Sequence, residues 1–369
     1  MALLDALDEA RRRTLDLVAE LDDDTVHRPL DPIMSPLVWD LGHIAAYEEL
    51  WCVHRISGAP LLHPELAAAY DAFETPRAVR GEIELLDRPQ ALAYLDEVRE
   101  RTLTVLDEHG ERDLHELALR HELQHTETMR QALFLGGHPA GSPNGSLPRV
   151  DAEPEWVEIP AGPFAMGAPD GDDARFAYDN EKPRHEAETG AFRITRTPIA
   201  NATFLRFVEG GGYVRREWWS DEGWAWKEEY DITHPLGWTG AADDRPVQHL
   251  SWFEADAFAR SLGARLPTEQ EWEKASTWDH GGAPALAAVG AVWEWTASEF
   301  TGYPGFRAHP YREYSEVFFD RGYRVLRGGS WAASPRVATR TFRNWDLPER
   351  RQIFSGVRLA ADPSAEVAA

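Results

Sequence analysis

The chain has 369 residues, of which 43% are hydrophobic and 15 are tryptophan, so it is long enough for two domains with buried cores. Its formal net charge of −25 argues against nucleic acid or an anionic membrane as a partner. The single cysteine, Cys52, excludes an internal disulfide and any mechanism that needs two thiols. Because we also find no signal peptide and no apolar run of about 18 residues, we expect a cytoplasmic protein without a membrane span.

Four helices are predicted in the first third of the chain from the spacing of apolar residues. They cover residues 2–21, 35–56 and 89–108 and a segment around His121. The first ends at the acidic run 22–24, and the second begins with Ser35 as N-cap and Pro36 at the first helical position. Helices of this length with modest connections predict a four-helix bundle, whose interior is a common place for metal ligands.

Two histidines occupy positions in the fourth helix that should be apolar. His121 follows Leu114 by seven residues and His125 precedes Ala132 by seven, so both rings should point inward. Residues four apart lie one above the other on a helix, which lets two ring nitrogens converge on one metal ion. A hydrogen-bonded pair in the core is the alternative. Two histidines do not name the metal, and a third ligand must come from elsewhere in the chain.

Composition changes to Gly, Pro, Ser and Asn between residues 136 and 154, which predicts a linker. Beyond it, short β-type runs alternate with turns and a few helices, a pattern typical of an irregular α+β domain. The predicted strands are 156–159, 192–194, 323–326 and 357–359, and the predicted helices are 200–208 and 252–261. We therefore divide the chain into a bundle (1–135), a linker (136–154), an α+β domain (155–362) and a flexible tail (363–369).

Four sequence motifs of the second domain carry a specific resemblance. They are RLPTEQEWEKA at 265–275, VWEWT at 292–296, RVLRGGSW at 324–331 and FSGVRLA at 354–360. Together they resemble the formylglycine-generating (sulfatase-modifying factor) fold, a C-type-lectin-like architecture. The first domain resembles a DinB-like four-helix bundle. The implied fold class is α+β, with the bundle first.

Fused in this order, with SPLVWDLGH at 35–43 and HELQH at 121–125, the chain resembles the ergothioneine-biosynthesis sulfoxide synthases, or hercynine oxygenases, over nearly its whole length. The resemblance implies a non-haem Fe(II) enzyme that takes O2 as co-substrate and joins a thiol to the imidazole of hercynine (trimethylhistidine). It implies His43, His121 and His125 as the iron ligands. Glu127 is a possible carboxylate ligand, but it follows His125 by two residues and so points to a different side of the helix.

The resemblance also implies a hercynine site. The segment FRNWDLPERRQIF at 342–354 matches a second motif of the family and supplies Asn344 and Trp345. With Gln124 these residues would surround hercynine, whose quaternary ammonium group is attracted to an aromatic face. Without the flanking motif, Trp345 would be interpreted as a core tryptophan.

A binding site for γ-glutamylcysteine is implied by three charged residues. Asp346 would receive the amino group, and Arg77 and Arg80, in YDAFETPRAVR at 70–80, would bind the carboxylates. Paired arginines suit carboxylates because each offers a planar fork of donors. The alternative interpretation of this pair is a solvated loop with two charges.

Tyr311 aligns with the catalytic tyrosine of the family, whose phenol supplies a proton and favours C–S bond formation over dioxygenation of the thiol. Tyr303 and Tyr314 lie close to it in sequence. One departure concerns the segment between Lys274 and Val292, which is shorter than the family pattern and bears on thiol specificity.

Three alternatives stay open at this point. The same scaffold could serve a selenoneine synthase that takes a selenosugar, or an ovothiol-type synthase that joins cysteine to histidine. A non-catalytic, lectin-like protein with a zinc site is the third. Arg77, Arg80 and Asp346 favour γ-glutamylcysteine as the thiol donor. The oligomeric state is not predicted.

Overall fold

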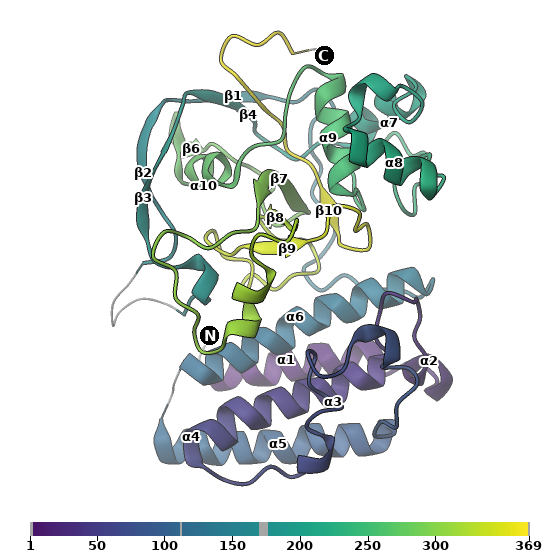
Figure 1. The fold of residues 1–369 in the computed structure, drawn as a ribbon, viewed down its shortest axis with the longest axis vertical. Coiled ribbons are helices and arrows are strands. Elements are labelled where there is room, and N and C mark those ends of the chain that lie inside the picture. The colour runs from purple at the N-terminus through teal and green to yellow at the C-terminus, as the bar shows by residue number, and fades with distance from the viewer. Residues whose placement is uncertain (1–2, 111–112, 170–175, 368–369) are drawn as a thin grey trace. The chain divides into compact units, whose positions relative to one another are not determined.

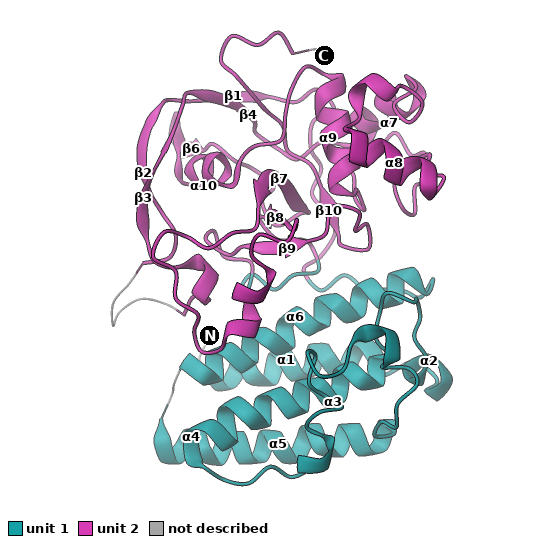
Figure 2. Ribbon diagram, in the orientation of Figure 1, with its two compact units in different colours: residues 1–143, 332–337 teal, residues 144–331, 338–369 magenta. Residues whose placement is uncertain are grey.

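The computed structural model describes residues 3–110, 113–169 and 176–367. They form two compact units (Figure 2). The first comprises residues 1–143 with 332–337, and the second comprises 144–331 with 338–369. The described residues contain no helix that is long and apolar enough to cross a membrane. Helices dominate the first unit and strands and helices mix in the second, which confirms the predicted α+β class.

The first unit is a bundle of long helices (Figure 1). Its helical segments are α1 (Leu3–Val18), α2 (Asp23–His27), α3 (Leu37–Glu48), the π-helix η1 (Glu49–His54), α4 (Arg55–Ser57), the 3-10 turns η2 (Pro64–Leu66) and η3 (Arg77–Val79), α5 (Arg88–His109) and α6 (Asp113–Leu135). Helix α3 packs against α5 and α6, and α1 packs against α6. All four predicted helices are present; the predicted first residue, Ala2, lies outside the described residues.

Two predicted helix ends were wrong. Helix α3 begins at Leu37, with Pro36 at the N-cap and no side-chain cap, because the hydroxyl of Ser35 instead accepts a hydrogen bond from Arg80 Nη1 (2.9 Å). Helix α1 ends at Val18, before the predicted end at residue 21, and the acidic run 22–24 begins another helix. The carboxylate of Asp22 accepts from the Thr25 N–H at 2.8 Å and starts the additional helix α2.

A layer of buried charge crosses the bundle. The guanidinium of Arg11, on α1, donates to Glu122 Oε1 and Glu48 Oε2, each at 2.9 Å. Arg99, on α5, donates to Glu48 Oε1 at 2.7 Å and to Glu122 Oε2 at 3.0 Å. Thr14 Oγ1 also donates to Glu122, at 2.8 Å. Each carboxylate is therefore shared by two arginines, and the network joins α1, α3, α5 and α6.

The second unit is built on two small sheets. The three-stranded sheet has the order β1 (Trp156–Ile159), β4 (Phe192–Thr195) and β11 (Ala360–Ala361), all antiparallel. The four-stranded sheet has the order β10 (Ser355–Gly356), β7 (Trp293–Glu299), β8 (Arg324–Arg327) and β9 (Asn344–Asp346), with β10 parallel to β7. Two hairpins pair β2 (Gly162–Met166) with β3 (His185–Thr189) and β5 (Asp279–His280) with β6 (Ala283–Pro284).

Helices and 3-10 turns complete this unit. They are η4 (Asp179–Glu181), α7 (Asn201–Glu209), η5 (Arg216–Trp218), α8 (Asp221–Glu229), α9 (Trp252–Ser261), α10 (Glu269–Thr277), η6 (Arg312–Tyr314) and η7 (Glu316–Phe318). Helices α8 and α10 were not predicted. Helix α10 begins with a capping box between Thr268 and Glu271, a pattern that is visible in the sequence. The predicted strand 357–359 was also wrong, because these residues lie between β10 and β11.

Charged residues of the four sequence motifs and of the segment 342–354 pair with one another in the interior of the second unit. Arg358 and Glu294 are fully buried and form a two-pronged ion pair, with both N–O distances 2.7 Å. Arg343 pairs with Glu269 in the same way, at 2.8 and 2.9 Å. Arg327 donates to Glu273 at 2.6 Å. These motif residues therefore hold the fold together, since a buried charge is tolerated when it is paired.

The charge layer of the bundle gives a stability prediction. We expect Arg99→Ala to lower the free energy of unfolding of the bundle by about 3–5 kcal/mol, because Glu48 and Glu122 would each lose a buried partner. Urea unfolding followed by circular dichroism at the helix band measures this. The control is Arg12→Ala, since the Arg12 side chain is 67% exposed. Equal midpoints for the two variants would contradict the role given to the network.

Candidate metal centre

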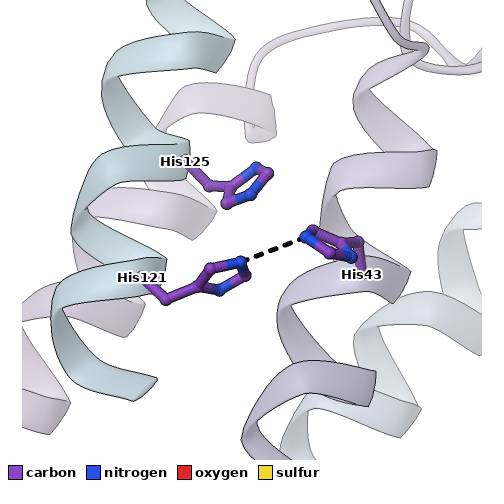
Figure 3. Close-up of side chains that lie close together, drawn as sticks. All are labelled: His43, His121 and His125. Atoms are coloured by element: carbon purple, nitrogen blue, oxygen red, sulfur yellow. Dashed lines mark hydrogen bonds between the residues drawn. The ribbon is translucent and has the colours of Figure 1, made fainter. Parts of the chain in front are cut away.

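Three histidines converge inside the first unit (Figure 3). His43 comes from α3, and His121 and His125 lie one turn apart on α6. One ring nitrogen from each histidine lies within 4.8 Å of the corresponding nitrogens of the other two. Among the described residues, these three histidines form the group that could hold a metal ion. Glu127, the carboxylate alternative, is not part of this group. The structure thus supplies a third imidazole beside the helical pair.

The spacing of the rings fits a metal ion. The Nε2 atoms of His43 and His121 are 3.1 Å apart. Two nitrogens that each lie about 2.1 Å from one ion are separated by about 3.0 Å at a right angle and by about 3.4 Å at a tetrahedral angle. The observed distance lies in this range. A three-nitrogen face of this kind leaves coordination positions open for other ligands.

The far side of two rings is held by an acceptor. His43 Nδ1 lies 2.6 Å from the carbonyl oxygen of Tyr70, and His125 Nδ1 lies 2.9 Å from Asp40 Oδ1. A carbonyl or carboxylate at Nδ1 selects the tautomer with the proton on that nitrogen, so Nε2 keeps its lone pair for a metal. It follows that His43 Nε2 is an acceptor in the metal-free protein. The contact at 3.1 Å is then donated by His121 Nε2, so this nitrogen would bind a metal only in the tautomer that carries the proton on Nδ1.

Aromatic rings on α3 pack against two of the histidines. Trp39, four residues before His43, stacks on its ring with centroids 4.5 Å apart. Tyr47, four residues after His43, stacks on His121 with centroids 3.6 Å apart and an interplanar angle of 9°. This packing restricts rotation of both imidazoles. The same face of α3 therefore supplies one candidate ligand and supports a second.

Burial keeps two of the candidate ligands, His43 and His121, neutral. Loss of hydration lowers the pKa of His43 and of His121 well below the ordinary value, and the nearby ring of His125 lowers both further. A neutral imidazole is the form that binds a metal. The cluster can therefore hold a divalent cation without first expelling protons at neutral pH.

Three other predicted site residues also belong to the first unit. Gln124 lies half-buried on α6, between the two histidines. Arg77 is exposed at the start of η3. Arg80, by contrast, is 4% exposed, stacks over the Trp39 ring at 3.6 Å, and donates to Thr75 O, Ser35 Oγ and Ala72 O. Most of its donor fork is therefore used inside the protein, which differs from the expected contact with a substrate carboxylate.

The remaining predicted residues lie in the second unit. Trp345, on the edge strand β9, stacks on Phe300 with centroids 4.3 Å apart. Tyr314 approaches Trp345 edge-on at 5.8 Å and Tyr311 at 6.3 Å, so Tyr314 joins these two predicted residues in one aromatic cluster. Asn344, the residue before Trp345, is half-buried, and its side-chain oxygen accepts from the Trp345 N–H.

Asp346 ends strand β9 and is half-buried. Its Oδ1 accepts from the Leu347 N–H at 2.8 Å, and Gln352 Nε2 donates to Oδ2 at 3.3 Å. Arg350 Nε lies 3.8 Å from the same carboxylate. The side chain of Asp346 is thus held in place by neighbours from its own loop.

The residues that contact the histidine rings were not predicted from the sequence. Asp40 and Tyr47 lie three residues before and four after His43, and this spacing places them on one face of α3. This spacing could have identified both residues from the sequence. No sequence pattern predicted the carbonyl of Tyr70, because its contact depends on the path of the 58–87 segment.

Comparisons with known proteins agree with the two-unit organisation. Residues 6–138 match the DinB superfamily, and residues 144–287 and 285–363 match the sulfatase-modifying factor enzyme 1-like domain. A hercynine oxygenase from Mycolicibacterium smegmatis is 41% identical over 425 aligned positions, which cover 98% of each chain. Because the alignment is longer than this chain, the relative carries segments that are missing here.

Two further relatives are similar. A hercynine oxygenase from Mycobacterium tuberculosis is 40% identical over 96% of this chain and 97% of its own. Ergothioneine biosynthesis protein 1 from Schizosaccharomyces pombe is 23% identical, over 92% of this chain and 53% of its own length. Because this chain is 41% identical to the first relative over 98% of both chains, it belongs to the hercynine oxygenase family.

Proposed function

We propose that the protein is a non-haem Fe(II), O2-dependent sulfoxide synthase that joins hercynine to γ-glutamylcysteine in ergothioneine biosynthesis. One observation carries the proposal: three imidazoles converge in a chain that aligns over nearly its whole length with hercynine oxygenases. His43, His121 and His125 would hold the iron. When bound, Fe(II) supplies the means to bind and reduce O2, which the side chains of the protein lack.

The proposed reaction balances with one molecule of O2. The thiol of γ-glutamylcysteine and the ring C–H of hercynine each lose a hydrogen as the C–S bond forms. One oxygen atom ends in the sulfoxide and the other in water. O2 thus accepts four electrons, and no external reductant is required.

Hercynine recognition is assigned to Gln124, Asn344 and Trp345. An amide offers both a donor and an acceptor to the polar groups of this substrate. The electron-rich face of Trp345 attracts the trimethylammonium group, which has no N–H to donate. These roles rest on the sequence resemblance and on the chemistry of the side chains.

γ-Glutamylcysteine recognition is assigned to Arg77, Arg80 and Asp346, with unequal roles for the arginines. Arg77 is exposed at the start of η3 and offers its guanidinium to a substrate carboxylate. Arg80 would act mainly by holding this segment, because its donors already bind the chain. Asp346 would pair with the amino group of the substrate.

Tyr311 is assigned the proton transfer. A phenol has one proton to give and can recover it from solvent or from the departing thiol proton. Proton delivery at the correct step would favour C–S bond formation over oxidation of the thiol alone.

Metal binding tests the first part of the proposal. Protein purified under argon should bind about one Fe(II) per chain, and His121→Ala should abolish tight binding because two imidazoles make an incomplete site. Metal analysis and anaerobic titration measure this. The matched control is His109→Ala, at the exposed end of α5. Tight zinc without any O2 uptake would instead favour a non-catalytic, zinc-binding protein.

A substrate panel tests the reaction. With hercynine present, we expect the fastest O2 consumption and a sulfoxide product with γ-glutamylcysteine, rather than with cysteine, glutathione or a selenosugar. Oxygen uptake with mass spectrometry of the products provides the measurement. Preference for the selenosugar would identify a selenoneine synthase. Preference for cysteine, with histidine in place of hercynine, would identify an ovothiol-type synthase.

The role of Tyr311 predicts a change of product. Tyr311→Phe should keep normal Fe(II) binding but divert turnover from the sulfoxide to the sulfinic acid of the thiol, because only the phenolic proton is lost. Product analysis by mass spectrometry shows the ratio. Tyr303→Phe is the control, since this buried ring lies nearby in sequence. Normal sulfoxide yield and rate in Tyr311→Phe would remove this residue from the proposal.

A further inference from the structure

We propose that Asp40 is a positioning residue for the metal centre, and that its carboxylate makes His125 the strongest of the three ligands. The inference rests on the metal binding proposed above. The carboxylate is 2% exposed, and Oδ1 lies 2.9 Å from His125 Nδ1. A carboxylate that accepts from the far nitrogen of an imidazole increases the electron donation of the near nitrogen to a metal.

The three rings are supported by different groups. His43 Nδ1 faces a neutral carbonyl, that of Tyr70, whereas His125 Nδ1 faces a full negative charge. His121 is supported by the stacked ring of Tyr47. Because ionised acceptors form hydrogen bonds about twice as strong as neutral ones, the proton of His125 is the most strongly attracted away from its ring. The ligand set is therefore electronically unequal.

The position of Asp40 links the two helices of the site. It precedes His43 by three residues, so both side chains lie on the same face of α3. Helix α3 thus supplies one candidate ligand directly and orients another that comes from α6. A shift of α3 along its axis would disturb both at once.

Burying a carboxylate costs more desolvation free energy than burying a neutral side chain, so the burial of Asp40 calls for an explanation. Asp40 Oδ2 is buried and has no hydrogen-bond partner among the described residues. Arg80, which is stacked on Trp39, is attracted electrostatically to Asp40. The hydrogen bond with His125 gives the Asp40 carboxylate a role at this buried position. This also gives Arg80 a use that does not depend on a substrate.

Metal affinity of a charge-neutral variant tests the inference. We expect Asp40→Asn to bind Fe(II), added alone under argon, about 10–100-fold more weakly than the unmodified protein. Asp96→Asn is the control, because it removes the same charge from an exposed position on α5. If the unmodified protein binds no Fe(II), the proposed function and this inference both fail. If it binds Fe(II) and Asp40→Asn binds equally well, the inference alone is overturned.

A second measurement does not require a variant to fold. In the metal-free protein with 15N-labelled histidine, nuclear magnetic resonance distinguishes the two neutral tautomers of each ring. We expect the proton of His125 on Nδ1, where Asp40 accepts it. A proton on Nε2 of His125 would overturn the inference, whatever the affinity of the variant.

Discussion

The sharing of two buried carboxylates by two arginines is the constraint on which the metal centre depends. Glu48 lies next to Tyr47, which stacks on His121, and Glu122 lies next to His121 itself. Each carboxylate contacts both Arg11 and Arg99. The network therefore fixes the rotation of α3 and α6 relative to each other. His43 and His121 lie on these two helices, so the network supports the helix pair that brings the histidines together.

The site combines neutral ligands with a charged support. Three imidazoles leave the charge of a bound divalent ion uncompensated, which favours anionic ligands such as a thiolate at the open positions. Asp40 contributes its negative charge one step away, through His125, without occupying a coordination position. In the proposed site, Asp40 would thus adjust the electron density at the metal while the open positions stay free for substrates.

The features that the sequence predicted are local in origin. The long helices follow from the spacing of apolar residues, and the inward histidines follow from the same period. Two local signals, the capping box of α10 and the Asp22 cap of α2, were overlooked, whereas other differences involve tertiary contacts. Ser35 was a plausible N-cap, but Arg80 from a distant segment uses its hydroxyl. Arg80 itself was expected to face a substrate, and only the folded chain shows that Trp39 and two carbonyls already surround it. The spacing of Asp40 from His43 places it on the same face of α3, but its contact with His125 depends on the packing of α3 against α6.

The internal ion pairs of the second unit have a consequence for comparing sequences. The motifs through which this chain resembles its relatives owe much of their character to residues such as Glu294, Arg343 and Arg358, which neutralise one another in the interior. These motif residues therefore indicate that a chain adopts this fold. They would also be retained in a homologue that had lost its catalytic activity. Sorting active homologues from inactive ones should therefore start from the histidines of the bundle rather than from these motifs.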